Sequence, residues 1–407
     1  MSVPKLRFLE FQDALEWEEK KLGQISDIRT GPFGSVLHES DYVEIGTPII
    51  TVEHLDDLGI KGNNFPRVSD DDKVRLGSYQ LKEGDIVFSR VGSVDRSSII
   101  RTHESGWLFS GRLLRLRIKK LQENSAQFLS QLLKYEPSKV KIRDRAVGQT
   151  MPSLNTEILN SVAFHFPSLL EQQKIADCLT SLESVITAQN QKLEALGVHK
   201  RGLMQQLFPS EGETVPKLRF LEFQDAGDWE EKEIGEVFRV TRGDVLSMTL
   251  VQDIKSDEMQ YPVYSSQTKN DGLAGFYSDY LYENAITWTT DGANAGDVNY
   301  RSGKFYCTNV CGVLINTSGY ANPCVAALIN NVSRKYVSYV GNPKLMNGVM
   351  SKIVIALPPL LEQQKIADCL TTLEQLITAQ KQKLEMLKVH KKGLMQQLFP
   401  APDEAQA

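Results

Sequence analysis

The sequence predicts an α+β protein in which two unlike domains are joined and spaced by a pair of long coiled-coil helices, with a pseudo-twofold internal duplication. Three observations predict this architecture. A short segment recurs in the middle of the chain, a 41-residue segment with helical periodicity occurs twice, and the stretches between these copies do not resemble each other. A duplicated frame with divergent contents indicates that the two halves perform different versions of one task.

The short repeat begins near the N-terminus. Residues 4–14 recur unchanged at 216–226, and each copy is followed by Trp-Glu-Glu-Lys, at Trp17 and at Trp229. At 407 residues, the chain is long enough for two or three domains. The predicted order is an N-terminal tag segment (1–21), a first variable domain (22–167), a first helix (168–209), a linker with the repeated tag (210–233), a second variable domain (234–358), a second helix (359–400) and a disordered tail (401–407).

The long repeat, 169–209 and 360–400, differs at only seven positions and carries a heptad seam of apolar residues. Polar residues replace apolar ones at the same seam positions in both copies: Gln189, Lys200, Gln380 and Lys391. The residues expected to pack in the seam are Ile175, Leu179, Leu182, Ile186, Leu193 and Leu196, and Ile366, Leu370, Leu373, Ile377, Leu384 and Leu387.

A helix of about 39 residues spans roughly 58 Å and cannot bury its seam alone. Because the two copies match in length and register, we favour pairing between them over dimerisation with another chain. The seam does not decide whether they run parallel or antiparallel. A rigid pair of this kind would hold two domains a fixed distance apart.

Short β-rich runs alternate with turns in both variable domains, for example at 85–89, 113–118, 285–289 and 310–315, which predicts α+β folds. The net charge of −5 argues against non-specific coating of DNA, but a basic face can lie on an acidic protein. Residues 90–120 are rich in arginine, and on the strand at 113–118 arginines alternate with apolar residues. The candidate DNA-binding residues of this domain are Arg90, Arg96, Arg112, Arg115 and Arg117. A solvated strand face is the alternative interpretation.

In the second variable domain the polar side chains gather in two loops, 265–270 and 289–294. Their residue types read base edges but also form ordinary turns. The candidate DNA-binding residues are Gln267, Lys269, Asn270, Thr290 and Asn294.

Several function classes are disfavoured by missing motifs. The chain contains no phosphate-binding G-x-x-x-x-G-K-[ST] loop, no Asn/Asp-Pro-Pro-aromatic methyltransferase motif and no H-E-x-x-H or G-x-S-x-G motif. Five cysteines suit a reducing compartment, and Cys307, Cys311 and Cys324 are expected to be buried thiols in strands rather than metal ligands. The sequence therefore predicts no catalytic residue, no metal and no cofactor bound by this chain. With neither a membrane span nor an apolar leader, we expect a cytoplasmic protein without membrane contact.

The chain resembles the specificity subunits of type I restriction–modification systems along nearly its whole length. The resemblance rests on the duplicated Pro-Lys-Leu-Arg-Phe tag, on the helix entries Leu-Glu-Gln-Gln-Lys-Ile-Ala at 170–176 and 361–367, and on Gly-Leu-Met-Gln-Gln-Leu-Phe at 202–208 and 393–399. Gly-Asp-Ile-Val-Phe-Ser-Arg at 84–90 is similar to a recurring piece of the family's target-recognition domains.

The resemblance implies that two target-recognition domains each read half of a bipartite asymmetric site on double-stranded DNA. It implies antiparallel helices that set the gap between the halves and dock two modification (methyltransferase) subunits, which methylate adenine with S-adenosylmethionine. Restriction subunits would join them and use ATP and Mg²⁺ to translocate and cleave DNA. Two other functions stay open at this stage: a free-standing bipartite DNA-binding regulator, and a coiled-coil scaffold without DNA binding.

Overall fold

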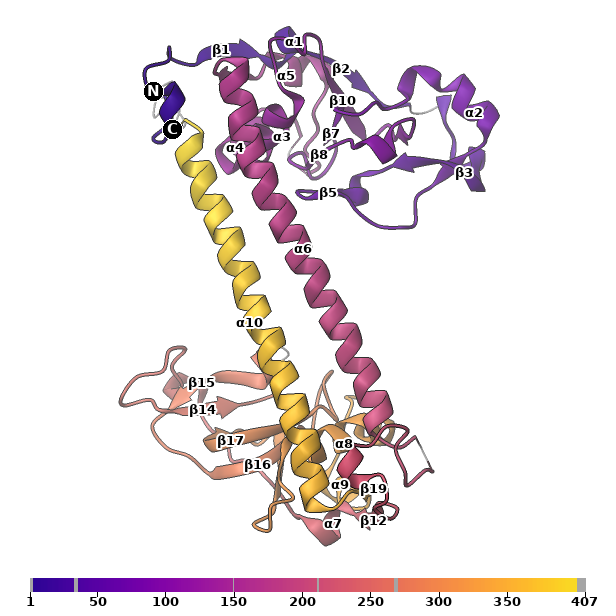
Figure 1. Ribbon diagram of the computed structural model, residues 1–407, viewed down its shortest axis with the longest axis vertical. Coiled ribbons are helices and arrows are strands. Elements are labelled where there is room, and N and C mark those ends of the chain that lie inside the picture. Colours follow the sequence, from indigo (N-terminus) through magenta and orange to yellow (C-terminus); the bar gives the residue numbers. More distant parts are fainter. Residues whose placement is uncertain (1–2, 33–35, 149, 211, 267–269, 401–407) are drawn as a thin grey trace. The chain divides into compact units, whose positions relative to one another are not determined.

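A computed structural model describes residues 3–32, 36–148, 150–210, 212–266 and 270–400. The chain divides into two compact units. Unit 1 comprises residues 1–191 and 382–407, and unit 2 comprises residues 192–381. Each unit therefore contains one variable domain and a part of each long helix (Figure 1). The predicted tail at 401–407 lies outside the described residues.

The variable domain of unit 1 is built on a four-stranded antiparallel sheet. Its strand order is β2 (Ser26–Thr30), β10 (Leu113–Ile118), β7 (Ile86–Ser89) and β8 (Ser97–Ile99). Three smaller sheets accompany it: β6 (Arg67–Val68), β3 (Tyr42–Ile50) and β9 (Leu108–Phe109); β4 (Leu55–Asp56) and β5 (Gly59–Ile60); and β1 (Glu18–Lys21) and β11 (Ala163–Phe166). The α-helices of this domain are α1 (Leu22–Ile25), α2 (Asp70–Arg75), α3 (Ala126–Lys134), α4 (Glu136–Arg143) and α5 (Thr156–Ser161).

The variable domain of unit 2 has a six-stranded sheet in which only β14 and β17 pair in parallel. Its strand order is β13 (Arg239–Arg242), β18 (Cys311–Ile315), β16 (Tyr282–Thr289), β17 (Val298–Cys307), β14 (Tyr261–Tyr264) and β15 (Leu273–Tyr277). A two-stranded sheet of β12 (Glu230–Glu233) and β19 (Val354–Leu357) and the helices α7 (Ile234–Val237), α8 (Pro323–Ser333) and α9 (Asn347–Met350) complete it.

The repeated segments adopt the same structure in both units. The Glu-Glu-Lys that follows each tag tryptophan forms strand β1 or β12, and each strand pairs with the strand that leads into a long helix, β11 or β19. The helices are α6 (Leu169–Leu207) and α10 (Leu360–Leu398), each of 39 residues. All twelve seam residues named from the sequence are buried or half-buried.

Within each unit the two helices run antiparallel, which answers the question that the seam left open (Figure 1). The lysine at the polar seam position of each helix pairs with a glutamate of the facing helix, and this contact occurs in both units. Lys391 on α10 donates to Glu183 on α6 at 2.6 Å in unit 1, and Lys200 on α6 pairs with Glu374 on α10 in unit 2. A lysine can occupy a seam position here because a glutamate of the facing helix neutralises it.

The tag segments fasten the helix ends. In unit 1 the backbone N–H of Leu6 donates to the carbonyl of Gln397 at 2.9 Å, near the end of α10, and Arg7 donates to both carboxylate oxygens of Glu171 at 2.5 and 2.8 Å, in the first turn of α6. Unit 2 repeats this arrangement with the helices exchanged: Leu218 bonds to Gln206, and Arg219 bonds to Glu362. Each tag thus joins the start of one helix to the end of the other, and this fixes their antiparallel direction.

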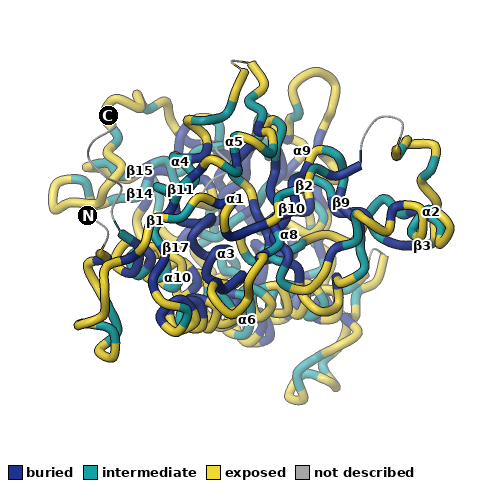
Figure 2. Tube along the Cα trace, turned by 90° about the horizontal axis from the view of Figure 1, so that it is seen from above, coloured by how far each residue is buried: buried dark blue, intermediate teal, exposed yellow. Residues whose placement is uncertain are grey.

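The core of each unit combines residues of its variable domain with residues of the helices. Figure 2 colours the buried residues dark blue. In unit 1, Trp17 and Phe128 share a cluster with Leu398 and Phe399, from the C-terminal end of α10 and just beyond it. In unit 2, Trp229 and Trp288 share a core cluster with Leu207, at the end of α6. Burying these large aromatic side chains attaches each domain to its part of the helix pair.

Candidate nucleic-acid interface

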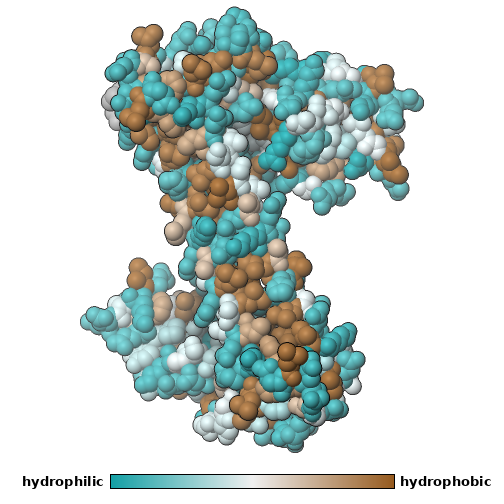
Figure 3. All heavy atoms as spheres, in the orientation of Figure 1, coloured by the Kyte–Doolittle hydropathy of each residue, from teal (hydrophilic) through white to brown (hydrophobic). Residues whose placement is uncertain are grey.

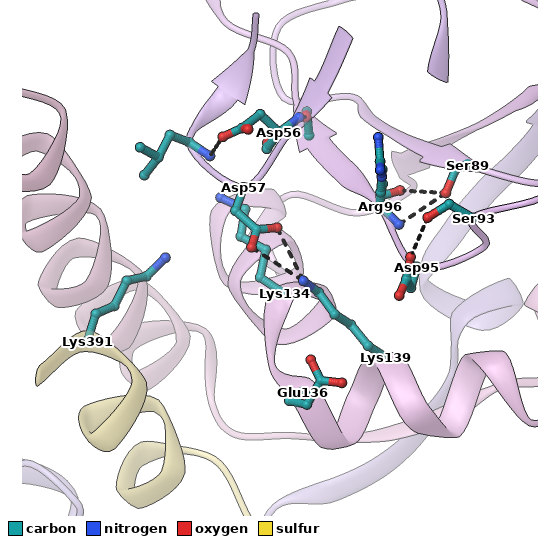
Figure 4. A network of polar contacts seen from close by, with 12 residues as sticks. Asp56, Asp57, Ser89, Ser93, Asp95, Arg96, Lys134, Glu136, Lys139 and Lys391 are labelled. Atoms are coloured by element: carbon teal, nitrogen blue, oxygen red, sulfur yellow. Dashed lines mark hydrogen bonds and ion pairs between the residues drawn. The ribbon is translucent and has the colours of Figure 1, made fainter. Parts of the chain in front are cut away.

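Three of the five arginines predicted in the first variable domain lie together at one end of its main sheet. Arg90 follows β7, Arg96 comes just before β8, and Arg112 comes just before β10. The backbone N–H of Arg90 donates to the carbonyl of Arg112 at 3.1 Å, and that of Ser89 donates to the carbonyl of Arg96 at 2.9 Å. The hydroxyl of Ser89 also donates to the carbonyl of Arg96 and accepts from its backbone N–H (Figure 4). Arg96 and Arg112 are exposed and Arg90 is half-buried, so this end of the sheet presents positive charge to solvent.

The other two arginines have internal partners. Arg115 is only 3% exposed and forms an ion pair with Asp27, and Arg117 donates twice to the carboxylate of Asp85, both at 2.6 Å. Burial lowers the pKa of Arg115, whereas the hydrogen bonds to Asp85 raise the pKa of Arg117. Arg115 is buried and Arg117 is half-buried, so the solvated strand face that was the alternative interpretation of 113–118 does not describe these two positions.

The loop between β7 and β8, residues 90–96, is anchored to a neighbouring turn. The carbonyl of Arg90 accepts from Leu154 at 2.8 Å, and the N–H of Gly92 donates to Pro152 at 2.9 Å. An isolated β-bridge joins Val91 to Ser153. These bonds use only backbone atoms, so the side chains of the loop are left to vary.

The loop between β16 and β17 in unit 2, residues 290–297, has the same anchoring. The carbonyl of Thr290 accepts from Leu345 at 2.9 Å, the N–H of Gly292 donates to Pro343 at 3.0 Å, and a bridge joins Asp291 to Lys344. Gly92 and Gly292 both have positive φ, 78° and 94°, which glycine adopts without strain. The two loops are therefore equivalent in position and backbone structure.

Equivalent backbone positions in these two loops carry different side chains. Where Arg90 bonds to Arg112 in unit 1, Thr290 bonds to Val310 in unit 2 at 3.0 Å. The backbone bond from Ser89 to Arg96 in unit 1 corresponds to a bond from the N–H of Thr289 to the carbonyl of Asp297 in unit 2, also at 3.0 Å. Three positions that are all basic in unit 1 are thus neutral or acidic in unit 2. Sequence reasoning missed this equivalence, for which a glycine three residues after the last residue of each strand was a signal.

Two of the residues predicted in the second domain, Thr290 and Asn294, lie on this loop. Thr290 is 1% exposed, and its hydroxyl contacts Asp291 at 2.8 Å and the carbonyl of Val310 at 2.9 Å. The amide of Asn294 donates to the carbonyl of Ser266 at 3.4 Å, which brings the two predicted loops together. Asn270 is exposed with a left-handed φ of 50°. Gln267 and Lys269 lie outside the described residues.

The cysteines do not form a ligand set. Cys307 on β17 and Cys311 on β18 are buried in strands as expected, but the expectation was wrong for Cys324, which is buried in helix α8. Among the described residues, no group of three or more His, Cys, Asp or Glu side chains could hold a metal ion. Of the helices described, none combines the length and apolar composition that a membrane span needs.

The family model described as the type I restriction modification DNA specificity domain matches this chain twice, over residues 14–197 and 226–389. The chain belongs to this family. Its two matches coincide with the two copies of the duplicated frame and their variable domains. The DNA specificity subunits of type I restriction–modification enzymes are therefore the class of protein to which this chain is assigned.

Relatives and solved structures agree with this assignment. A protein of Methanocaldococcus jannaschii, named as the specificity subunit of a type I restriction enzyme, MjaX, is 27% identical over 94% of this chain and 93% of its own length. The specificity subunit of the type I restriction enzyme MpnII of Mycoplasma pneumoniae is 35% identical over 35% of this chain and 43% of its own length.

Two solved structures share the fold. The S subunit of a type I restriction–modification system from M. genitalium matches with a TM-score of 0.68 at 16% identity, over 98% of this chain and all of that one. A chain from a structure on complex assembly and conformational transition of the type I system matches with a TM-score of 0.53 at 14% identity, over 95% of this chain and 98% of that one.

Proposed function

We propose that this chain is the non-catalytic DNA-reading subunit of a type I restriction–modification enzyme, and that each variable domain reads one half of a bipartite asymmetric site. The observation that carries this proposal is the pair of equivalent loops, 90–96 and 290–297, which have the same backbone hydrogen bonds but unlike side chains. A reader of two different half-sites needs this combination, because the backbone sets the position of the loop and the side chains select the bases.

The positive charge at one end of the main sheet in unit 1 supports the proposal that this end contacts DNA. Arg90, Arg96 and Arg112 are contributed there by three separate strand ends. Arginine contacts phosphates through charge and guanine through two parallel hydrogen bonds, so these side chains suit either role. Arg115 and Arg117, with their carboxylate partners, would instead stabilise the sheet that carries the other three.

The helices would dock two modification subunits. Exposed apolar residues occur at equivalent positions of α6 and α10, as the pairs Leu170 and Leu361, Val185 and Leu376, and Val198 and Val389. Apolar side chains interrupt the hydrophilic surface along the helices (Figure 3). A duplicated apolar surface fits two copies of one partner. Restriction subunits would complete the enzyme, with S-adenosylmethionine, ATP and Mg²⁺ on the partner subunits rather than on this chain.

The decisive experiment exchanges one reader. The purified chain should transfer no methyl group to DNA by itself, and should direct adenine methylation at one bipartite motif when a modification partner is added. Replacing residues 22–167 with the matching domain of a relative should change one half of that motif.

A chain that binds its site tightly and recruits no modification partner would be a regulator, and a chain that binds no DNA with or without partners would be a scaffold.

A further inference from the structure

Unit 1 contains a cavity of about 680 Å³ between its variable domain and the helix pair. Its walls come from the β4–β5 turn (56–58), the junction of α3 and α4 (134–139), and the facing surfaces of α6 and α10. Figure 4 labels four of the lining residues, Asp57, Lys134, Lys139 and Lys391. The volume lies within the range of about 300–1,000 Å³ that is usual for small-molecule sites.

The two helix copies diverge at this cavity. Three of the seven positions at which they differ line it: Asn190, Lys388 and Lys392. Their counterparts in the other copy are Lys381, Gly197 and Arg201. Elsewhere the frame is almost unchanged, so the cavity is a property of unit 1 that the duplication alone does not explain.

Positive charge exceeds negative charge around the cavity. Five lysines line it, and four of them contact carboxylates. Lys139 pairs with Asp57 at 3.3 Å, while Lys134 and Lys391 share Glu183 at 3.0 and 2.6 Å. Lys388 pairs with Glu385 on its own helix. Lys392 has no ion pair with any residue in the part of the chain that the structure describes. The acidic lining residues Asp56 and Glu136 pair with Lys61 and Arg143. About two positive charges are left without a counterpart.

The remaining lining is apolar with two amides. Leu58, Pro137, Ile186 and Met395 provide apolar walls, and Asn190 and Gln396, whose side chains end in amides, also line the cavity. Side-chain amides can donate and accept together at the edge of a nucleobase. A ligand that satisfies all three features combines a doubly charged anion, a flat partly apolar body and an edge that can form hydrogen bonds.

We propose that this cavity binds a nucleoside phosphate. The phosphate lies against Lys392 on the lysine-rich side of the cavity, and the base lies against the apolar walls with its edge toward Asn190 and Gln396. No covalent step is involved. A free nucleotide and a DNA strand both carry this group, and the experiment below separates these two sources.

The test is a calorimetric titration of the purified full chain at low ionic strength with AMP, adenosine and inorganic phosphate. AMP should bind, and adenosine and phosphate should each bind at least about tenfold more weakly, because each lacks half of the recognised group. Lys392→Ala should weaken AMP binding about tenfold, as expected for a lost charge-assisted contact. The matched control is Arg201→Ala, the same helix position in the other copy, which should leave AMP binding unchanged.

Competition identifies the source of the phosphate. If a short DNA duplex displaces AMP from the wild-type chain, the natural occupant is a DNA strand; if AMP binding is unaffected, the occupant is a free nucleotide. Absence of AMP binding, binding no tighter than that of adenosine, or an equal loss in Arg201→Ala would overturn the proposal. None of these results depends on a modification partner or on sequence-specific DNA reading, so the proposed function is tested separately.

Discussion

Glu183 on α6 accepts a hydrogen bond of 2.6 Å from the ammonium group of Lys391 on α10, and Lys134 of the variable domain donates to the same carboxylate at 3.0 Å. The side chains of Glu183, Lys391 and Lys134 are 14%, 12% and 3% exposed. The equivalent pair in unit 2, Glu374 and Lys200, is 49% and 34% exposed. One repeated seam contact is therefore buried under a domain in unit 1 and open to solvent in unit 2.

Replacing Glu183 with Gln should destabilise unit 1 by about 3–5 kcal/mol, because it leaves two buried ammonium groups without a carboxylate. The matched variant Glu374→Gln should cost about 0–1 kcal/mol, since exposed ion pairs contribute little. Chemical denaturation followed by the fluorescence of the tag and domain tryptophans measures both changes. Equal losses in the two variants would show that the burial difference has no energetic consequence.

The contribution of Glu183 should also depend on pH. Burial by itself raises the pKa of Glu183, but the charges of Lys134 and Lys391 outweigh burial and the pKa is lowered overall. A carboxylate whose pKa is lower in the folded state stabilises fully above its unfolded value, about 4.3, and that stability is lost as pH falls through the folded value. The difference in unfolding free energy between wild type and Glu183→Gln should therefore be constant near neutral pH and shrink below about pH 4.3. A difference that stays constant through acid would contradict this linkage.

The tag ion pairs should be equally important in both units. Arg7 and Glu171 are 7% and 1% exposed, and Arg219 and Glu362 are 6% and 1% exposed. Alanine at either arginine leaves a buried carboxylate unpaired, so each variant should lose about 3–5 kcal/mol. Hydrogen exchange followed by mass spectrometry should show faster exchange at the helix ends of the altered unit. Protection that is unchanged around both tags would show that the backbone bonds of Leu6 and Leu218 suffice.

The exposed arginines of unit 1 should contribute to DNA binding. Alanine at Arg90, Arg96 or Arg112 should weaken binding to all sequences and reduce the slope of log affinity against log salt by about one if the residue contacts a phosphate. At a base contact it should instead relax specificity by about 1–3 kcal/mol at one position. Lys120→Ala, at the opposite end of β10, serves as the control and should change neither quantity.

Arg115→Ala should act differently from these three. Because Arg115 is buried against Asp27, its loss should lower the stability of the sheet before it alters the salt dependence. Fluorescence anisotropy measures DNA binding by the Arg90, Arg96 and Arg112 variants. If all three bound DNA with the affinity and salt dependence of the wild type, the basic end of this sheet would be an ordinary solvated surface.

Lengthening both helices should change the spacing of the half-sites. Four residues inserted after Gln191 and four after Gln382 add about 6 Å to each helix at about 1.5 Å per residue. DNA rises about 3.4 Å per base pair, so the preferred gap should widen by about one or two base pairs while each half-site keeps its sequence. The methylome of cells that carry the lengthened subunit and its modification partner measures the gap. An active enzyme with the original gap would show that the helices serve docking alone.

Most of the fold could be predicted from the repeated segments of the sequence. The heptad seam of the long repeat predicted helices within a residue or two of Leu169–Leu207 and Leu360–Leu398. The seam by itself could not predict their antiparallel direction, which only the family resemblance implied, because apolar seams pack in either direction. The information lies in the contacts of Leu6 and Arg7 with opposite helices, and such long-range contacts leave no local pattern.

The candidate DNA-binding residues were harder to sort. Alternation on the strand at 113–118 does not reveal that a second layer covers its polar face, so Arg115 and Arg112 looked alike in sequence although one is buried and the other exposed. The equivalence of the loops at Arg90 and Thr290 was also hidden, since their shared structure consists of backbone hydrogen bonds that many side chains permit.

The attachment of Phe399 and Leu398 to the core around Trp17 affects the order in which the protein is completed during translation. Unit 2 is one continuous stretch, 192–381, whereas unit 1 needs residues from both ends of the chain. The ribosome makes the first domain early, yet that domain obtains its last core residues only after all of unit 2 has been synthesised. A message truncated before residue 382 would encode all of unit 2 and leave unit 1 with an unfilled core. The first reader to be synthesised is thus the last to become complete.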